Sequence, residues 1–302
     1  MRKSFLSFDG TELSVLCWDQ VDNPVACVQI AHGMSENVSR YEGFARFLNE
    51  NGIIVFGDDH RGHGETAKGR YGRVGSDCFF KTVQDELFIS EYLKEKYNLP
   101  LVYFGHSYGS FLGQAYLQSN NVADAVVLTG SCFMGKLLPA LGALVADVEA
   151  TFTDEEHPSK IMAKLSLGLA SKAFSEGPQG WLTRDKEVQK AYSEDETCGF
   201  DLSAGFYSSF MKGLKSVAKK KNIQKIRKDI PILIASGDED PIGKNGKGVK
   251  KLYDKYVDAG IRDVTLKLYE GARHEILNET NKEEVRTFIL QYILSRTNGD
   301  KA

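Results

Sequence analysis

The sequence predicts an α/β fold in which a mostly parallel sheet carries helices on both faces and a helical segment interrupts the later strands. Three observations support this prediction. Short runs rich in β-branched and aromatic residues alternate with stretches of helical periodicity over residues 25–128. The alternation stops after Gly130 and resumes at Pro231. The chain has 302 residues, 42% of them hydrophobic, which is enough for one large core.

The first part of the chain is expected to open with a hairpin and continue as alternating strands and helices. Strands over residues 3–8 and 13–18 flank Asp9-Gly10-Thr11, a turn sequence. Further strands are predicted over residues 25–31, 53–57, 100–104 and 123–128. Helices are predicted over residues 41–51, where Gly52 ends the first, over 82–97, and from Ser110 to about Gln118. This order is typical of parallel βαβ units.

The pattern is helical, with glycine and proline breaks, from Ser131 to about Gly205. Strands then follow over residues 231–236 and 264–269, with helices over 249–259 and 282–294. One sheet domain with an insert explains this order better than two tandem domains. We therefore divide the chain into a first core part (1–130), a helical cap (131–205) and a second core part (206–302).

Composition excludes several classes of partner. The net charge of −3 provides no global basic field for nucleic acid or an acidic membrane, and Lys219-Lys220-Lys221 is interpreted as a solvated face. The five cysteines are widely spaced and form no CxxC pair, which indicates free thiols in a reducing compartment. The N-terminus has no apolar signal region, and no apolar stretch is long enough to span a bilayer. A cytoplasmic protein is expected.

The central motif is Gly105-x-Ser107-x-Gly109, placed between a predicted strand and a predicted helix. A serine hydroxyl is a weak nucleophile unless it is exposed and held near a base. A sharp strand-to-helix turn exposes it, the glycines leave room for neighbouring backbone, and the helix N-terminus faces the developing negative charge. Ser107 is therefore predicted to be a catalytic nucleophile.

The partners of such a serine follow it in the order acid, then histidine, each on a loop after a strand. Beyond Ser107 the only histidines are His157, in the insert, and His274, directly after a predicted strand, so His274 is the predicted base. The acid must come from Gly237-Asp-Glu-Asp-Pro241. We favour Asp240, because the acid lies a few residues past the strand and Pro241 helps to fix the backbone. Asp238 remains an alternative.

A tetrahedral intermediate also needs two hydrogen-bond donors for its oxyanion. One is the backbone N–H of Tyr108, the residue after the nucleophile. The second comes from the loop after the third strand, where the candidate is the N–H of Met34 in His32-Gly33-Met34.

With these motifs in place, the chain resembles the monoacylglycerol lipase and lysophospholipase branch of the α/β-hydrolases, often labelled serine aminopeptidase S33 or Hydrolase-4. The resemblance runs nearly end to end. The matching segments are His32-Gly-Met-Ser-Glu, Arg40-Tyr41, Asp59-His-Arg-Gly-His-Gly64, Gly105-His-Ser-Tyr-Gly109, Gly237-Asp-Glu-Asp-Pro241, Gly271-Ala-Arg-His274, and in the insert Trp181-Leu-Thr-Arg-Asp185 and Cys198-Gly-Phe200.

The resemblance implies the α/β-hydrolase fold, with an eight-stranded sheet and a helical cap after the sixth strand. It also implies no cofactor and the hydrolysis of carboxylic esters that carry a fatty acyl chain. The aminopeptidase label fits less well, because proline iminopeptidases of this superfamily carry His-Gly-Gly-Pro-Gly where this chain has His32-Gly33-Met34.

Asp58, Asp59, His60 and His63 are residue types that bind metals. No third nitrogen or sulfur ligand accompanies them, and the resemblance makes residues 60–63 a structural loop beside the active site. We therefore predict no metal site.

The insert carries apolar residues at helical spacing, followed by several aromatic residues. This face either packs on the sheet domain or lines an acyl-chain groove over Ser107, and peripheral contact with a membrane is a third interpretation. The candidate substrate-binding residues are Leu141, Leu144, Trp181, Phe200, Phe206 and Tyr207.

The sequence thus predicts a serine esterase acting on small acyl esters, with its oligomeric state left open. Two alternatives remain. An aminopeptidase or amidase would need a group for a free α-amine, for example Glu149, Glu155 or Glu176 in the cap. A non-catalytic binding protein of the same fold would usually have lost part of the triad.

Overall fold

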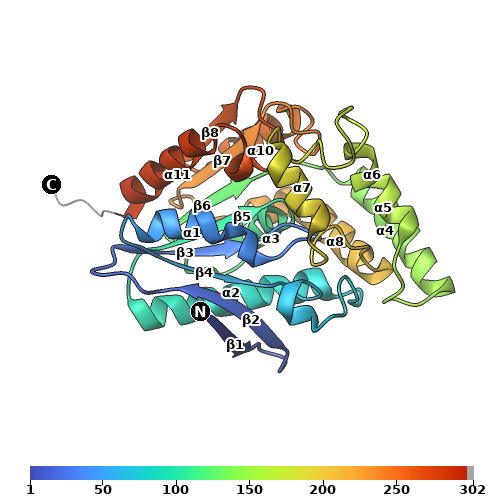
Figure 1. Ribbon diagram of the computed structural model, residues 1–302, viewed down its shortest axis with the longest axis horizontal. Coiled ribbons are helices and arrows are strands. Elements are labelled where there is room, and N and C mark those ends of the chain that lie inside the picture. Colours follow the sequence, from blue (N-terminus) through green and yellow to red (C-terminus); the bar gives the residue numbers. More distant parts are fainter. Residues whose placement is uncertain (298–302) are drawn as a thin grey trace.

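The computed structural model describes residues 1–297, apart from the side chains of Leu167 and Leu169, and is built around a sheet of eight strands (Figure 1). The spatial order is β1-β2-β4-β3-β5-β6-β7-β8. β1 pairs antiparallel with β2, β2 pairs antiparallel with β4, and all later pairs are parallel. The prediction of a mostly parallel, eight-stranded α/β-hydrolase sheet is confirmed. The strands are β1 (Arg2–Leu6), β2 (Glu12–Trp18), β3 (Ala26–Ala31), β4 (Ile53–Asp58), β5 (Leu101–His106), β6 (Ala125–Thr129), β7 (Ile232–Gly237) and β8 (Val264–Tyr269).

The burial of each strand follows its place in the sheet. Every residue of β3, β4, β5, β6 and β7 is buried, which explains their near-continuous apolar sequences. β1 alternates between exposed and half-buried residues, as expected at a sheet edge. Each predicted strand agrees with the observed one to within a few residues.

Helices cover both faces of the sheet (Figure 1). α1 (Glu42–Asn49) and α11 (Lys282–Thr297) pack on one face, while α2 (Cys78–Tyr97), α3 (Tyr108–Leu117) and α10 (Lys247–Asp258) pack on the other. α2 begins four residues before the predicted start. Its first turn buries Cys78 and Phe79, which pack against residues of the helix Ala204–Val217. These two residues do not extend the apolar helical periodicity from which the start of α2 was predicted. Three short 3₁₀ turns complete this part: Val38–Tyr41, Gly64–Ala67 and Ile276–Asn278.

The chain between β6 and β7 forms helices that gather on the right of Figure 1. α8 (Ala204–Val217) packs against α4 (Leu137–Phe152) and also against α2 and α3. Close approach depends on glycine: a Cβ on Gly142 of α4 would meet Met211 of α8, and one on Gly213 of α8 would meet Phe79. α8 crosses residue 205, where the sequence places the boundary between the cap and the second core part. That boundary stays a prediction. The helices are α4 (Leu137–Phe152), α5 (Lys160–Leu165), α6 (Leu167–Ala170), α7 (Lys186–Glu194), α8 (Ala204–Val217) and α9 (Lys220–Ile223).

All five cysteines are unpaired and buried. Among residues 1–297, no helix combines the length and the apolar character needed to cross a membrane.

Candidate active site

Ser107 lies on the turn between β5 and α3, with φ of 50° and ψ of −114°. A positive φ at a non-glycine residue is strained and persists only where the surroundings impose it. Two glycines allow this close packing. A Cβ on Gly105 would lie 2.4 Å from the carbonyl oxygen of Gly109, and one on Gly109 would lie 2.0 Å from that of Ala31. The backbone therefore has the shape that the motif predicted, and Ser107 itself is half-buried.

His274 and Asp240 lie together on the loops that follow β8 and β7. Nδ1 of His274 is 2.9 Å from Oδ2 of Asp240, and both side chains are buried. The other carboxylate oxygen of Asp240 accepts the N–H of Ile242 at 2.8 Å. This arrangement holds the imidazole in one orientation, as an acid does for the base of a triad.

The environment favours opposite charges on this pair. Burial alone lowers the pKa of His274, but the charge and hydrogen bond of Asp240 outweigh it, so the pKa of His274 is raised. Burial raises the pKa of Asp240, but His274 and two backbone N–H groups outweigh it, so the pKa of Asp240 is lowered. The imidazolium that forms during proton transfer is therefore stabilised.

The ring of His274 lies beside the turn that carries Ser107. The N–H of Ser107 donates to the carbonyl of Thr129 at 2.9 Å. At the next residue, Gly130, a Cβ would lie 2.8 Å from Cε1 of His274. Nε2 of His274 has no hydrogen-bond partner within residues 1–297, so it is free to accept a proton. Catalytic hydrogen bonds are often long before substrate binds.

Asp238, the alternative acid, lies elsewhere. Its Oδ1 accepts the N–H of Gly271 at 2.7 Å and so shapes the histidine loop from behind. Of the two aspartates left open by the sequence, the structure brings Asp240 to the imidazole.

The loop after β3 lies against the nucleophile turn. The N–H of Gly109 donates to the carbonyl of His32 at 2.9 Å, and a Cβ on Gly33 would lie 3.3 Å from the Cβ of Ser107. Tyr108 is the first residue of α3, so its N–H has no partner within the helix. The segments that carry the Met34 and Tyr108 amides are therefore adjacent, as an oxyanion hole requires.

A buried charge network, not anticipated from the sequence, joins the oxyanion loop to the histidine loop. The two terminal nitrogens of Arg40 bind the carboxylate of Glu275 at 2.8 and 2.7 Å, and Arg40 also pairs with Glu36. Glu36 in turn accepts the N–H of Gly33. Burial raises the pKa of Glu275, but Arg40 outweighs it and lowers that pKa to about 2. In the sequence, Glu36 and Arg40 fall within segments that match the family and Glu275 directly follows His274, but nothing there pairs the three residues.

The candidate substrate-binding residues separate into groups. Trp181, Phe200 and Tyr207 line one cavity of about 420 Å³. The Trp181 ring is 4.9 Å from the ring of His274, so one wall of the cavity contacts that histidine, while Ser107, Asp240 and His274 are not among the residues that line the cavity. Phe206 is fully buried against Tyr108, with ring centroids 5.0 Å apart, and has no surface available to a substrate in this conformation.

Leu141 and Leu144 are 53% and 60% exposed on α4. The interpretation that this face packs on the sheet domain is therefore wrong for both residues. α4 instead turns its small residues, Ala143 and Ala146, inward, because these allow α8 to approach closely.

The three cap glutamates considered for a free amine already have partners. Glu176 forms an ion pair with Arg273 at 2.6 Å, Glu155 accepts the N–H of Ser76 at 2.9 Å, and Glu149 accepts the hydroxyl of Ser159. None of these contacts leaves a carboxylate prepared for an amine.

The four residues weighed for a metal do not form one group. Asp59 pairs with Arg2 at 2.6 Å, and His63 accepts the N–H of Ser35 at 3.1 Å. Asp58 and His60 lie together, and Glu86 joins them within 4.8 Å. The absence of a metal from the function stays a prediction.

Comparisons with known proteins concern the family and the fold of the chain. The model of the family described as "Hydrolase_4: Serine aminopeptidase, S33" matches residues 22–281. The chain is 28% identical to a monoglyceride lipase homolog of Monkeypox virus over 91% of this chain and 90% of the relative. It is 29% identical to the monoglyceride lipase of Homo sapiens over 90% of this chain and 82% of that one. A solved structure of a lipase in its open form superposes with a TM-score of 0.89 at 28% identity, covering 99% of both chains.

Proposed function

The chain belongs to the Hydrolase_4 family, described as serine aminopeptidase, S33, and from that membership we propose that it hydrolyses carboxylic esters of fatty acyl chains through Ser107, His274 and Asp240. It is an α/β hydrolase that acts on esters. The observation that carries the residue assignment is the 2.9 Å contact between His274 and Asp240 beside the turn of Ser107.

In the first half-reaction, Oγ of Ser107 forms a bond to the ester carbonyl carbon while Nε2 of His274 takes the hydroxyl proton. Asp240 holds the imidazole and stabilises its charged form. The backbone N–H groups of Met34 and Tyr108 donate to the oxyanion. When the intermediate collapses, the bond to the alcohol breaks and the alcohol leaves with the proton from His274.

In the second half-reaction, water attacks the acyl-enzyme and gives its proton to His274. The new tetrahedral intermediate collapses to the carboxylic acid, and Ser107 recovers its proton from His274. Both half-reactions use the same three side chains. In each, the backbone N–H groups of Met34 and Tyr108 stabilise the negative charge on the carbonyl oxygen.

The proposed substrates are fatty acyl esters of glycerol or of similar small alcohols, as in a monoacylglycerol lipase or lysophospholipase. Two relatives are named monoglyceride lipase or its homolog. The cavity beside Trp181 has a volume typical of small-molecule sites, and Phe200 and Tyr207 give it aromatic walls. We also propose that residues 131–205 form the cap over the site, inserted between core parts 1–130 and 206–302.

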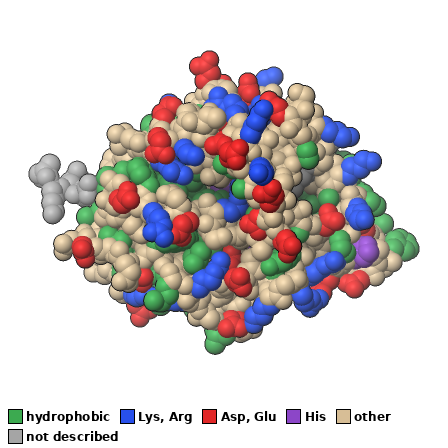
Figure 2. Space-filling model, viewed as in Figure 1, with side chains coloured by type: hydrophobic (Ala, Val, Ile, Leu, Met, Phe, Trp, Pro, Cys, Tyr) green, Lys and Arg blue, Asp and Glu red, His purple; other side chains and the backbone are tan. Residues whose placement is uncertain are grey.

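We propose that the cap contacts lipid surfaces peripherally. Large hydrophobic side chains of α4 and α5 are exposed, and Figure 2 shows hydrophobic side chains at the right-hand edge, where these helices lie in Figure 1. Exposed apolar patches of this kind mark sites of protein or membrane contact. The members are Leu137, Leu138, Leu141, Leu144, Val145, Val148, Phe152, Ile161 and Leu165, hereafter the apolar cap patch.

A substrate panel tests the proposed function. The purified enzyme should hydrolyse monoacylglycerols and aryl esters, react at Ser107 with a fluorophosphonate probe, and leave aminoacyl arylamides almost untouched. Ser107→Ala, the matched control, should lose both turnover and labelling while keeping its fold, because such a small change rarely costs much stability. Preferred cleavage of the arylamides would favour an aminopeptidase. Labelling retained in Ser107→Ala would refute the nucleophile, and no labelling of the wild type would indicate a non-catalytic binder.

A further inference from the structure

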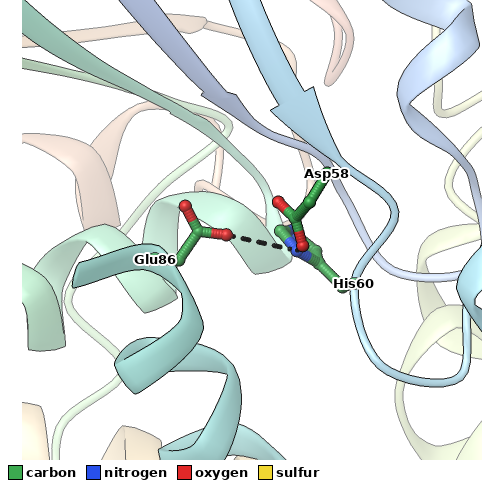
Figure 3. Close-up of side chains that lie close together, drawn as sticks. All are labelled: Asp58, His60 and Glu86. Carbon is green, nitrogen blue, oxygen red and sulfur yellow. Dashed lines mark hydrogen bonds and ion pairs between the residues drawn. The ribbon is translucent and has the colours of Figure 1, made fainter. Parts of the chain in front are cut away.

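A second histidine–carboxylate cluster lies buried beside the oxyanion loop, and the proposed mechanism does not use it (Figure 3). Asp58 ends β4, His60 follows two residues later, and Glu86 comes from α2. None of the three is more than 1% exposed. Nδ1 of His60 lies 3.0 Å from Oδ2 of Asp58 and 3.3 Å from Oε1 of Glu86.

The contacts of the His60 ring define its protons. Nε2 lies 3.2 Å from the carbonyl oxygen of His32, which can only accept, so Nε2 carries a hydrogen. Nδ1 faces the Asp58 carboxylate, and an unprotonated nitrogen there would set its lone pair against a negative oxygen. A proton on Nδ1 turns this repulsion into a charge-assisted hydrogen bond. With hydrogens on both nitrogens, His60 is an imidazolium.

The two carboxyl groups then differ in charge. Burial raises the pKa of Asp58, but the neighbouring His60 outweighs it and the pKa is lowered. Burial and the charge of Asp58 both hold the pKa of Glu86 well above its usual value, which favours the neutral acid. The pKa of His60 is lowered by burial but raised overall by Asp58. These shifts favour one positive charge on His60 and one negative charge on Asp58.

The other neighbours of His60 do not change this balance. His32 is stacked on His60 with ring centroids 4.0 Å apart, and burial together with the positive charge on His60 keeps its pKa well below the usual value. His63 is also neutral, since burial and His60 lower its pKa to about 3. Tyr108 of α3 faces the ring at 5.8 Å with its pKa raised by burial, and Asp59 binds Arg2.

His60 binds the oxyanion loop at two points. Its backbone N–H donates to Nε2 of His32 at 3.0 Å, which leaves the hydrogen of His32 on Nδ1, where it donates to the carbonyl of Gly33 at 2.7 Å. Its ring Nε2–H donates to the His32 carbonyl, which also receives the N–H of Gly109. Met34 comes two residues after His32, and Tyr108 comes directly before Gly109. The His32 carbonyl therefore joins the two segments that present the oxyanion donors.

We propose that His60, as an imidazolium paired with Asp58, is a positioning residue that fixes the oxyanion hole by clamping the His32 carbonyl against the start of α3. This inference rests on the proposed function, because it assigns the hole to Met34 and Tyr108. The oxyanion exists only in the transition state and the tetrahedral intermediates, so a loosened hole lowers kcat and leaves KM nearly unchanged.

Matched substitutions of the two carboxyl groups test the proposal. Asp58→Asn should lower kcat at least tenfold, keep KM within about twofold, and still reach full fluorophosphonate labelling at a slower rate. Glu86→Gln should cost less than about threefold, because an amide and a protonated carboxyl are both uncharged and similar in shape. Equal losses in the two variants, or a loss in Asp58→Asn confined to KM, would overturn the proposal. Failure of the wild type to label would instead refute the proposed function.

A measurement on the wild type avoids variants that fail to fold. In protein labelled with ¹⁵N-histidine, the His60 imidazole should keep both nitrogens protonated at a pH above the usual histidine pKa of about 6.5, where exposed histidines become neutral. This signal should persist in Glu86→Gln and change in Asp58→Asn. Loss of the second proton from His60 together with the exposed histidines would overturn the proposal. So would a tightly bound stoichiometric metal ion, since it would occupy Nδ1 in place of the hydrogen.

Discussion

The strain at Ser107 shows how single residues prepare this site. A non-glycine residue in such a backbone conformation costs ~1–3 kcal/mol, which the surrounding contacts must offset. Here the backbones of Ala31 and Gly109 pack so tightly that no side chain larger than hydrogen fits at Gly105 or Gly109. The turn is thus fixed by its neighbours, and the serine hydroxyl is presented before any substrate arrives.

The two aspartates after β7 provide a matched pair for testing the acid. Asp240→Asn should lower kcat by ~10³–10⁴-fold, because the amide favours the wrong imidazole tautomer and loses the charge that stabilises the imidazolium. Asp238→Asn should lose less than about tenfold, since its carboxylate accepts the N–H of Gly271 on the far side of the histidine loop. Steady-state kinetics on an aryl ester distinguishes the two variants. A reversed order of losses would identify Asp238 as the acid.

The raised pKa of His274 predicts the pH dependence of the reaction. The base must be neutral, so kcat/KM should fall as pH drops through a pKa above the usual histidine value of about 6.5. Glu275 contributes to raising the pKa of His274, so Glu275→Gln should move this acidic limb of the pH profile to lower pH. Arg40, then paired only with Glu36 among residues 1–297, would act in the same direction. Glu270→Gln removes the same charge at an exposed position and should leave the limb in place. An equal shift of the acidic limb of the kcat/KM profile in both variants would contradict the assignment of that limb to His274.

At the scale of elements, the sheet was predictable because its strands are buried on both faces. β3 to β7 therefore appear as short apolar runs in the sequence. Ser107 and Asp240 follow two of these strands, and His274 follows the adjoining β8. The insert was less predictable, because the most apolar face of α4 is exposed while small residues make its helix contacts. The Arg40–Glu275 pair joins residues 235 positions apart, which no local pattern reveals.

The apolar cap patch makes α4 a testable element. Replacing both Leu141 and Leu144 with asparagine should weaken binding to neutral phosphatidylcholine vesicles at least tenfold, because a buried leucine contributes ~1.5–3 kcal/mol. The fold should be unaffected, since both side chains are exposed. Val257→Asn on α10 is the control, an exposed apolar residue outside the patch. If the double variant instead flattens the acyl-length dependence on monomeric esters, these residues line the acyl groove.

At the scale of the whole molecule, parallel strands collect distant residues at one edge of the sheet. His32 follows β3, Asp58 ends β4, Ser107 follows β5, Asp240 follows β7 and His274 follows β8. All five strands run in the same direction, so their carboxyl ends meet along one edge. Their connections carry the residues proposed as base, acid and nucleophile and the proposed oxyanion loop, while the segment between β6 and β7 brings Trp181 against His274.

This combination of sheet edge and cap predicts how activity depends on acyl length. Each buried methylene contributes ~0.8 kcal/mol, so kcat/KM for monomeric aryl or glycerol monoesters should rise several-fold per two carbons from acetyl upward. The rise should end in a plateau once the groove is full. Triacylglycerols should be poor substrates if the proposed cap narrows the approach to Ser107. The measurement is a series of esters assayed below their critical micelle concentrations, so that aggregation does not mimic selectivity. Rates that peak at acetyl and fall with length would mean that the cap packs without forming a groove, and would define a short-chain esterase.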